Sequence, residues 1–375
     1  MDLALTADQV AFRDEARAWL REHVVLPGQF ASTADEVAWG RAWQAQLAEG
    51  RWVGIGWPHE YGGRGASPVE VALFNLEYAR SRAPQPVNRV GLNLAGPTLL
   101  AHGTDDQRRR WLPPLLRADE IWCQLFSEPD AGSDLASLTT RAEPTDGGYV
   151  LNGQKVWTSY AQFARWGICL ARTDATAAKH RGISYLVVDM TAPGVEVRPL
   201  VQMTGEDEFS EVFLTDVVVP ADHLIGERDD GWRVANTTLA HERGTSFPFK
   251  EQVVHEVFFA RLLDDVVAAG RFDDPLIREE LAAVYVRLRL LALGNLRTLT
   301  NLDRGREPGP ESSWIKLLWT DLTRSLSDLA VRLRPDDIAW QRQFLWSKAA
   351  SIAGGTSEVQ RTIIGERILG LPRYG

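Results

Sequence analysis

Two segments in the middle of the chain carry side chains suited to binding a flat, polar ligand. Phe126–Asp134 is a dense run of hydroxyls, acids, glycine and proline, and such an irregular loop offers backbone N–H groups to a heterocycle or a phosphate. Further along, Lys155–Ser159 is predicted to be a strand, in which Trp157 and Ser159 share a face because side chains alternate. An aromatic plane beside a hydroxyl can stack on a ring and bond its edge. A solvated turn and a core tryptophan are the structural alternatives.

A third segment supplies a candidate proton acceptor. A helix is predicted from Gly231 to about Phe247, and its apolar stripe consists of Trp232, Ala235 and Leu239. Glu242 lies on that stripe because it follows Leu239 by three residues. An unpaired carboxylate that faces the interior has a raised pKa, which suits a general base near neutral pH. An ion pair with a nearby arginine is the structural alternative.

The fourth segment, Ala353–Glu358, places two glycines before a helix. Glycine lets the backbone approach a ligand closely, and the N–H groups of a first helical turn favour a pyrophosphate or a developing oxyanion. Ser357 and Gln360 have the spacing of a capping box, so Ser357 is expected to be the N-cap. A simple turn is the alternative.

An α, β, α order of elements must position these segments. Residues 1–120 show helical periodicity, residues 121–228 contain short runs of β-branched residues, and residues 229–375 return to the helical period. Within Tyr149–Trp157, the pair Asn152-Gly153 is expected to form a type I′ turn between two strands, because both turn residues need a positive φ. We therefore expect an all-α N-terminal domain, a central antiparallel β-barrel or sandwich, and a C-terminal helical domain.

The composition excludes several classes of function. With 45% hydrophobic and 24% charged residues, the chain is expected to fold around a core rather than remain disordered. The net charge of -9, without a basic block, argues against nucleic acid or an anionic membrane as a partner. No metal-ligand spacing, Walker motif or complete Rossmann motif occurs, so no metal is expected. Two cysteines, Cys123 and Cys169, and the lack of a signal peptide or long apolar span favour the cytoplasm.

Taken together and in this order, the segments resemble the acyl-CoA dehydrogenase family over nearly the whole chain. The motifs that carry the resemblance are Ser127–Asp134, Asn152–Ser159 and Gly354–Arg361, with Trp57–Gly63 as a further family-like loop. Members of this family are α+β multidomain proteins with an N-terminal helical domain, a central β domain and a C-terminal four-helix bundle. The resemblance therefore implies three domains with the boundaries given above.

The resemblance implies a flavoprotein of lipid metabolism that acts in β-oxidation or steroid side-chain degradation. Members bind FAD and take the α-proton of an acyl-CoA with a glutamate, while the β-hydrogen leaves as hydride to the flavin and a trans-2-enoyl-CoA results. By position, the residues implied at FAD are Phe126, Ser127, Gly132, Ser133, Trp157, Ser159, Thr356 and Glu358. The residues implied at the substrate are Ser133, Arg243 and Gly355.

The position of the catalytic glutamate departs from that in much of the family. Many members carry it directly before the Gly-Thr of the C-terminal motif, where this chain has Gly354. A smaller group, represented by the isovaleryl-CoA and long-chain enzymes, carries it on the helix that opens the C-terminal domain, directly before an arginine, as in Glu242-Arg243. The resemblance thus implies Glu242 as the base and leaves the N–H of Gly354 to polarise the thioester carbonyl. The volume freed at Gly354 favours a branched, cyclic or steroid-side-chain acyl group.

Two departures from the family concern the cofactor and the substrate. Two family segments hold the adenine half of FAD across a subunit interface, Arg-x-x-Phe-Gly and Gln-x-x-Gly-Gly-x-Gly, and neither has a match in residues 270–337. Many members also have an aspartate that contacts the pantetheine arm of the substrate, and this chain has Ala240 in its place. The alternatives are a subunit of a heteromeric acyl-CoA dehydrogenase with an incomplete FAD site, and an oxygen-using flavin oxidase or monooxygenase. The resemblance also implies electron-transferring flavoprotein as acceptor and a dimer or tetramer, either of one chain or with a paralogous subunit.

Overall fold

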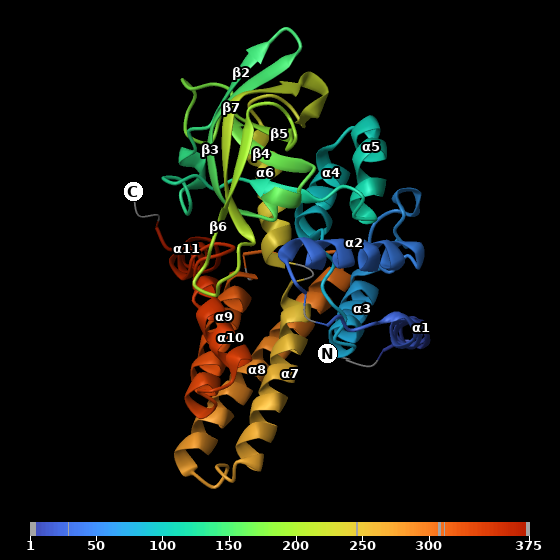
Figure 1. The fold of residues 1–375 in the computed structure, drawn as a ribbon, viewed down its shortest axis with the longest axis vertical. Coiled ribbons are helices and arrows are strands. Elements are labelled where there is room, and N and C mark those ends of the chain that lie inside the picture. The colour runs from blue at the N-terminus through green and yellow to red at the C-terminus, as the bar shows by residue number, and fades with distance from the viewer. Residues whose placement is uncertain (1–4, 29, 245–246, 307–308, 311, 373–375) are drawn as a thin grey trace. The chain divides into compact units, whose positions relative to one another are not determined.

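The computed structural model divides into two compact units, each assembled from separate stretches of the chain (Figure 1). Unit 1 consists of Met1–Leu26, Ala66–Ala83 and Arg243–Gly375, and unit 2 consists of Pro27–Gly65 and Pro84–Glu242. The amino-terminal helices are thus shared between the two units. The structure describes residues 5–28, 30–244, 247–306, 309–310 and 312–372.

The described part of unit 1 is helical. Its main helices are α1 (Ala7–His23), α3 (Pro68–Arg80), α7 (Phe247–Ala268), α8 (Pro275–Asp303), α9 (Ser312–Leu333), α10 (Ile338–Ser347) and α11 (Ser357–Ile363).

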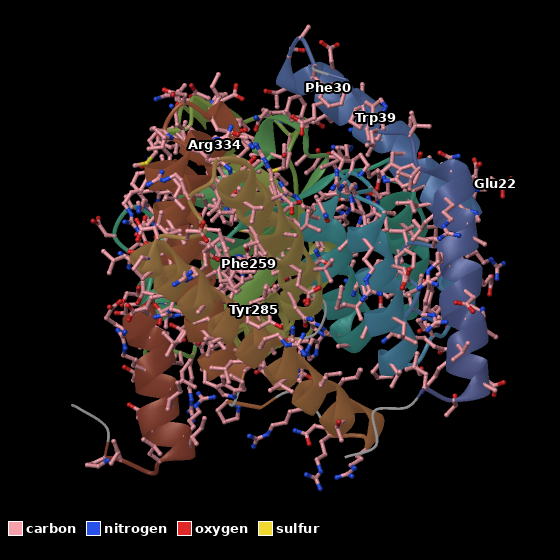
Figure 2. The ribbon with its side chains drawn as sticks, turned by 90° about the horizontal axis from the view of Figure 1, so that it is seen from below. Glu22, Phe30, Trp39, Phe259, Tyr285 and Arg334 are labelled. Atoms are coloured by element: carbon pink, nitrogen blue, oxygen red, sulfur yellow. The ribbon has the colours of Figure 1, made fainter. Side chains whose placement is uncertain are left out.

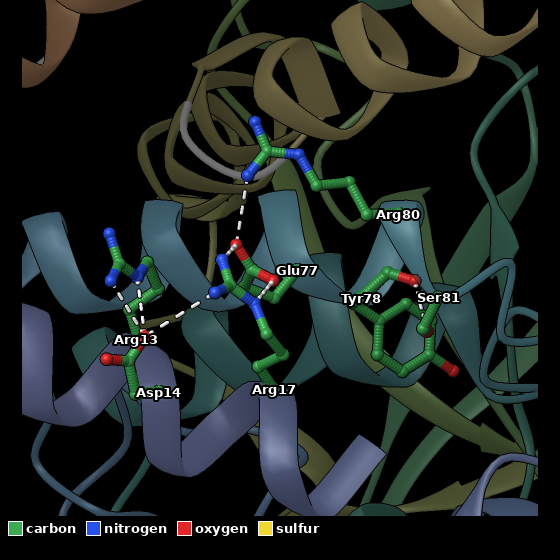
Figure 3. A network of polar contacts seen from close by, with 7 residues as sticks. All are labelled: Arg13, Asp14, Arg17, Glu77, Tyr78, Arg80 and Ser81. Carbon is green, nitrogen blue, oxygen red and sulfur yellow. Dashed lines mark hydrogen bonds and ion pairs between the residues drawn. The ribbon is translucent and has the colours of Figure 1, made fainter. Parts of the chain in front are cut away.

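Helices α1 and α3 of unit 1 each begin with a capping box and are joined by an ion pair. Nε and Nη2 of Arg17 on α1 donate to the two carboxylate oxygens of Glu77 on α3, at 2.8 and 2.9 Å (Figure 3). Arg80, three residues after Glu77, donates to the same carboxylate at 2.9 Å. The two helices are therefore held together by charge as well as by their apolar faces.

Helices α7 to α10 surround one apolar core, as expected for a C-terminal helical domain. On α8, the buried residues Ile277, Leu281, Val284, Leu288 and Leu291 recur three and four residues apart, which is the spacing of one helix face. These side chains pack with buried residues of α7, α9 and α10. Burying one face of every helix stabilises the bundle, because each large aliphatic side chain removed from water contributes about 1.5–3 kcal/mol.

Unit 2 combines helices with a sheet. Its helices are α2 (Thr33–Glu49), α4 (Gly96–His102), α5 (Asp105–Leu116) and α6 (Gly231–Gly244). Two buried amides link α2 to α5 and the segment before α4 to the first strand. Gln44 Nε2 donates to the carbonyl of Leu116 at 2.9 Å, and Asn88 accepts from the N–H of Trp122 at 2.9 Å.

The sheet of unit 2 has eight strands in the order β6-β7-β3-β2-β4-β5-β8, with β1 paired to β4. The pairing is mostly antiparallel, but β1 and β2 both run parallel to β4. The sheet does not close into a barrel within the described residues, so the predicted α+β class is confirmed while the closed barrel is not. The strands are β1 (Trp122–Leu125), β2 (Arg141–Thr145), β3 (Gly148–Ser159), β4 (Trp166–Arg172), β5 (Ile183–Asp189), β6 (Val195–Leu200), β7 (Phe209–Pro220) and β8 (Leu224–Ile225).

The type I′ turn predicted at Asn152-Gly153 is wrong. These two residues lie inside the continuous strand β3, and the chain turns earlier, between β2 and β3. Gly153 is required for close packing, because a Cβ there would lie 2.4 Å from Oγ1 of Thr140. The amide of Asn152 exchanges two hydrogen bonds with Asp216 on β7, each 3.0 Å long, beside a shift in register between the strands. The pair therefore marks a β-bulge rather than a turn.

Candidate active site

The Phe126–Asp134 loop is attached to strand β3 through a buried ion pair. The side chain of Lys155 on β3 is fully buried, and its Nζ donates to Oε1 of Glu128 at 2.9 Å. The same Nζ donates to the carbonyl oxygens of Phe126 and Leu170, at 3.1 and 2.8 Å. All three N–H donors of the side chain thus have acceptors, which offsets the cost of burying it.

The carboxylate of Glu128 is equally well satisfied. Besides Lys155, it accepts from the N–H and Oγ1 of Thr139 at 2.6 and 2.8 Å and from the N–H of Thr140 at 2.9 Å. Burial acts to raise the pKa of Glu128, but the charge of Lys155 and the surrounding hydrogen bonds outweigh it and lower the pKa to about 2. Glu128 is therefore ionised at any physiological pH, and its role is to shape the loop rather than to transfer protons.

Trp157 lies on a second bulge in β3. The register against β7 shifts between Lys155 and Thr158, and Trp157 has a φ of +59°, a left-handed conformation that is rare for a bulky residue. The bulge turns the indole outward, so that 62% of Trp157 is exposed while Thr158 is buried. Strained backbone and exposed aromatic rings both concentrate at functional sites.

The structure brings four of the predicted flavin-binding residues together in unit 2. The N–H of Val156 donates to the carbonyl of Ser127 at 2.9 Å, which places the loop beside the bulged strand. The ring of Phe126 meets Tyr185 edge to face, at 5.8 Å between centroids. Trp157 and the half-buried Ser159 follow on the same strand. Thr158, which separates Trp157 from Ser159, is buried, but the bulge interrupts the strict alternation from which their shared face was predicted.

Gly132 and Ser133 lie at the exposed end of the same loop. A Cβ at Gly132 would meet no atom within 4 Å, so the backbone there is open to a ligand. Asp134 anchors the loop through Lys179 at 2.5 Å and through the hydroxyl of Ser137 at 2.6 Å. The hydrogen bond from Lys179 is the main cause that lowers the pKa of the Asp134 carboxyl.

Helix α6 carries the predicted base near its end. Among the residues of this helix whose burial is described, Gly231, Val234, Ala235 and Thr238 are buried, while Trp232 and Leu239 are half-buried. The inward face is therefore turned slightly from the stripe predicted from sequence, because the hydroxyl of Thr238 is satisfied inside by Thr98 at 2.8 Å and Tyr185 at 3.1 Å. Glu242 follows Thr238 by one helical turn. The side chains of Glu242 and Arg243 lie outside the described residues.

In unit 1, the Gly354–Gly355 pair forms a turn directly before α11. Both residues have a positive φ, +67° and +95°, which glycine adopts without strain. Gln360 is fully buried, and its Nε2 donates to the carbonyl oxygens of Gly354 and Gly355, at 3.2 and 3.3 Å. The amide of Gln360 thus binds the carbonyl oxygens of both glycines in the turn.

The predicted capping box at the start of α11 is wrong by one residue. Thr356 is the N-cap, and its hydroxyl accepts from the N–H of Val359 at 3.3 Å. Gln360 is then one position too late to bond the N-cap, and it packs against the glycine turn instead. Glu358 is exposed. A hydrogen bond from its own backbone N–H is the main cause that lowers the pKa of its carboxyl.

Sequence reasoning missed Lys155, Glu128 and Gln360 as the residues that hold these segments. Lys155 and Glu128 both stand within quoted motifs, but they are 27 positions apart, and no local spacing announces their contact. The available signal in the sequence is a lysine at an inward position of a predicted strand, because a buried charged side chain needs a partner of opposite charge.

The geometry in each unit fits a flavin nucleotide. In unit 2, an outward indole on a strained bulge stands beside a hydroxyl and a fixed loop, which suits a flat heterocycle with a polar edge. In unit 1, a glycine turn precedes a helix N-terminus. Within the described residues, no group of three His, Cys, Asp or Glu side chains could hold a metal ion. No described helix is long and apolar enough to cross a membrane.

Comparison with known proteins identifies the family. Residues 6–119, 123–217 and 229–369 match the models of the N-terminal, middle and C-terminal domains of acyl-CoA dehydrogenases. The chain belongs to the acyl-CoA dehydrogenase family, and it is an oxidoreductase of that type.

Several relatives cover the chain from end to end. The protein is 42% identical to acyl-CoA dehydrogenase IpdE1 of Mycobacterium tuberculosis over 384 residues, which is 98% of each chain. It is also 42% identical to acyl-CoA dehydrogenase FadE34 of the same organism, over 88% of this chain and 46% of that one. Among solved structures, the Tcur3481-Tcur3483 steroid ACAD is similar with a TM-score of 0.86 and 28% identity, and the ChsE4-ChsE5 complex from Mycobacterium tuberculosis with 0.84 and 31%. Both structures are covered fully, and both cover all of this chain.

Proposed function

We propose that this protein catalyses the FAD-dependent α,β-dehydrogenation of an acyl-CoA whose acyl group is branched, cyclic or a steroid side chain, giving the trans-2-enoyl-CoA. The observation that carries the flavin assignment is Trp157, turned outward on a strained bulge and backed by the buried Lys155–Glu128 pair. The class of substrate is supported by the similarity to a structure described as a steroid ACAD and by the absence of a side chain at Gly354.

In this proposal, the residues of unit 2 bind the flavin ring. The indole of Trp157 covers the ring, Ser159 bonds its edge, and the loop at Phe126 and Ser127 contacts its polar side. When bound, FAD supplies the acceptor for the hydride that leaves the β-carbon. Further contacts to the cofactor are proposed for Gly132, Ser133, Thr356 and Glu358.

The proton step is proposed for Glu242. Its carboxylate removes the proton from the α-carbon, while the N–H of Gly354 donates to the thioester oxygen and stabilises the charge that develops there. Ser133, Arg243 and Gly355 are proposed to contact the substrate. In this role the protein holds the acyl group in place and excludes water from the reacting carbon.

Changing Glu242 to Gln tests the base. Because the amide cannot accept the α-proton, turnover should fall by about 10²–10⁴-fold, the usual contribution of a general base. The assay is anaerobic bleaching of the flavin by branched, steroid and straight-chain acyl-CoA thioesters, with the visible spectrum of the variant as a control for bound FAD. Near-normal turnover in the fully flavinated variant would remove Glu242 from the mechanism.

Changing Trp157 to Ala tests the flavin assignment. The side chain is exposed, so the folded state should lose little stability, whereas loss of ring stacking should weaken FAD binding about 10-fold or more. Fluorescence titration of the apoprotein with FAD measures the effect, and Trp157→Phe is the matched control that keeps an aromatic plane. Equal FAD affinity in the Ala variant and the wild type would contradict the placement of Trp157 over the ring.

A heteromeric assembly is the second candidate for the working form. Two similar structures each consist of two named components, Tcur3481-Tcur3483 and ChsE4-ChsE5. Residues 270–337 of this chain have no match to the family segments for the adenine half of FAD. A chain that purifies without colour alone and yellow with a co-expressed paralogous subunit would establish this form. The proposal also includes a division into three domains, a cytoplasmic location and electron-transferring flavoprotein as the electron acceptor.

An oxygen-using oxidase is the remaining alternative. Peroxide formation without an added electron acceptor would identify it.

A further inference from the structure

Tyr185 on β5 contacts two parts of the candidate site within unit 2. Its side chain is fully buried. Its ring meets that of Phe126 edge to face, with 5.8 Å between the centroids, and its hydroxyl lies 3.1 Å from Oγ1 of Thr238 on α6. Phe126 belongs to the loop proposed to contact the flavin, and α6 carries the proposed base, Glu242. One side chain thus touches both the flavin loop and the helix of the base.

The hydroxyl of Tyr185 begins a chain of buried hydroxyls. Oγ1 of Thr238 lies 2.8 Å from Oγ1 of Thr98 on α4, which in turn lies 2.8 Å from the carbonyl oxygen of Leu94. Both threonines are buried. Leu94 belongs to the π-helical turn Gly91–Ala95, and such turns are frequent at functional sites. The chain therefore connects the sheet, α6 and an irregular turn that directly precedes α4.

Only one arrangement of the hydroxyl protons satisfies all three contacts. A carbonyl oxygen can only accept, so Thr98 donates to Leu94. Since Thr98 has no second proton, Thr238 donates to Thr98, and Tyr185 in turn donates to Thr238. Burial raises the pKa of the Tyr185 phenol, so the phenol keeps its proton at physiological pH. The chain is thus directed from β5 through α6 to α4.

These bonds fix the place of α6 along and around its axis. A shift of the helix by about 1 Å would stretch both bonds of Thr238 beyond the range of an O–H···O bond. The buried hydroxyls would then lack partners, which is costly in the interior. Glu242 follows Thr238 by four residues, about one helical turn. The backbone of Glu242 is therefore held by the same bonds.

We propose that Thr238, together with Tyr185 and Thr98, is a positioning residue for the dehydrogenation. Its hydroxyl holds α6, and with it the backbone of Glu242, in a fixed place relative to the loop at Phe126. This inference rests on the proposed function for the roles of Glu242 and Phe126. The hydroxyl chain passes no proton to the substrate. It determines where the base stands, and a misplacement of about 1 Å can cost about 100-fold in rate.

The test compares Thr238→Val with Thr238→Ser in the full flavin-loaded chain. Valine has the shape of threonine but leaves the phenol proton of Tyr185 without its acceptor and the oxygen of Thr98 without its donor. For reduction of the flavin by an acyl-CoA, kcat of T238V should fall about 10-fold or more, while KM changes less than about 2-fold. T238S keeps the hydroxyl and should stay close to the wild type.

The direction of the chain predicts an order among further variants. Tyr185→Phe removes only the first donor and leaves the bond between the two threonines, so its kcat should fall less than that of T238V. The double variant T238V/Y185F should be no slower than T238V, because no phenol proton is left without an acceptor.

Tyr285→Phe is the matched control for Y185F. Tyr285 on α8 lies at the same centroid distance, 5.8 Å, from the ring of Phe259 on α7 (Figure 2). However, Tyr285 is 49% exposed, so water can reach its hydroxyl. Y285F should therefore leave kcat unchanged.

Hydrogen exchange of the same chains, measured by mass spectrometry, tests the link without catalysis. T238V should speed exchange in residues 239–242 and in the loop around Phe126. Thr237→Val is the control on the same helix. Oγ1 of Thr237 lies 2.7 Å from Nε2 of His102, on a half-buried side of α6, so T237V should leave both kcat and the exchange of the loop unchanged.

The outcomes separate this proposal from the proposed function. Normal kcat in T238V with FAD bound would overturn the positioning role, and so would an equal loss in T237V or Y285F. If no acyl-CoA reduces the flavin of the wild type, the proposed dehydrogenation itself fails. Exchange then decides alone: faster exchange of both segments in T238V supports the link, and unaltered exchange overturns it.

Discussion

Among the residues that the structure describes, each of the two units has one buried glutamate paired with basic side chains, and the two glutamates connect different kinds of element. Glu77 of unit 1 and Glu128 of unit 2 have 4% and 5% of their surface exposed. Glu77 is clamped by Arg17 and Arg80, whose side chains are 36% and 54% exposed, and it joins two helices (Figure 3). Glu128 is paired with a fully buried lysine and joins an irregular loop to a strand.

The difference shows how one kind of interaction serves two purposes. Helices α1 and α3 keep their own hydrogen bonds whether or not the clamp is present, so Arg17 adds stability to elements that already exist. The loop that contains Phe126 and Ser127 belongs to no helix or extended strand and has only a few backbone hydrogen bonds. Nζ of Lys155 adds to them by donating to the carbonyl of Phe126 and to the carboxylate of Glu128. The pair at Glu128 therefore determines the shape of the candidate flavin site, whereas the clamp at Glu77 does not.

The largest effect is expected for Lys155→Met. The substitution puts an unbranched apolar side chain, one atom shorter than lysine, in its place and leaves the carboxylate of Glu128 buried without a cation. Breaking a buried pair on one side costs about 3–5 kcal/mol. The free energy of unfolding should fall by that amount in chemical denaturation, and FAD retention should fall with it. The double variant K155M/E128Q should recover part of the stability, since no charge remains buried. If the double variant is less stable than K155M, the pairing does not carry the effect.

A smaller effect is expected for Arg17→Met in unit 1. Glu77 keeps Arg80 as a partner, and the exposed guanidinium of Arg17 is screened by water, so the free energy of unfolding should fall by much less than in K155M. FAD affinity should remain unchanged, because the clamp does not shape the flavin site. Comparing unfolding and FAD titration of R17M with those of K155M measures the contrast directly. A loss of FAD affinity in R17M as large as in K155M would break the contrast between the two units.

The smallest effect is expected in the dependence of stability on pH. Burial lowers the pKa of His255 in unit 1 and of His223 in unit 2. Their contribution is complete above the unfolded pKa of about 6.5 and is lost as pH falls below it, at no more than about 1.4 kcal/mol per pH unit for each. The contribution of Glu128 is lost only at lower pH, between about 4.5 and the folded pKa of about 2.

Unfolding measured at pH 7.5 and 5.5 tests the histidines separately. In H255Q and H223Q, the loss of stability between these two values should be smaller than in the wild type. His255 bonds the carbonyl of Glu251 at 2.6 Å and Oγ1 of Thr323 at 2.9 Å, and glutamine can replace one of these contacts. An unchanged pH dependence in both variants would mean that other groups carry it.

The sequence was sufficient for the order of elements and for the segments of the site, because helical and strand periodicities are local properties. It could not predict that β1 and β2 run parallel to β4, since strand pairing depends on contacts between distant residues. The bulge at Trp157 has no glycine to mark it, and the turn predicted at Asn152-Gly153 failed because packing against Thr140 uses the glycine instead. Periodicity placed Glu242 on the apolar stripe of α6, which stays a prediction because that side chain lies outside the described residues. Periodicity could not detect the hydroxyl network that orients the helix.

Unit 1 is assembled from three separate stretches of the chain, and this arrangement affects the order in which its helices can pack during translation. Helix α3 packs against α7 and α8, but these helices leave the ribosome only after all of unit 2 has been translated. At ordinary rates of elongation, α3 waits roughly 10–45 s for the helices that cover it. During that interval its apolar face is exposed on a nascent chain whose later segment, Pro84–Glu242, is free to fold first. Helix α3 therefore reaches its final packing only after most of the chain has left the ribosome.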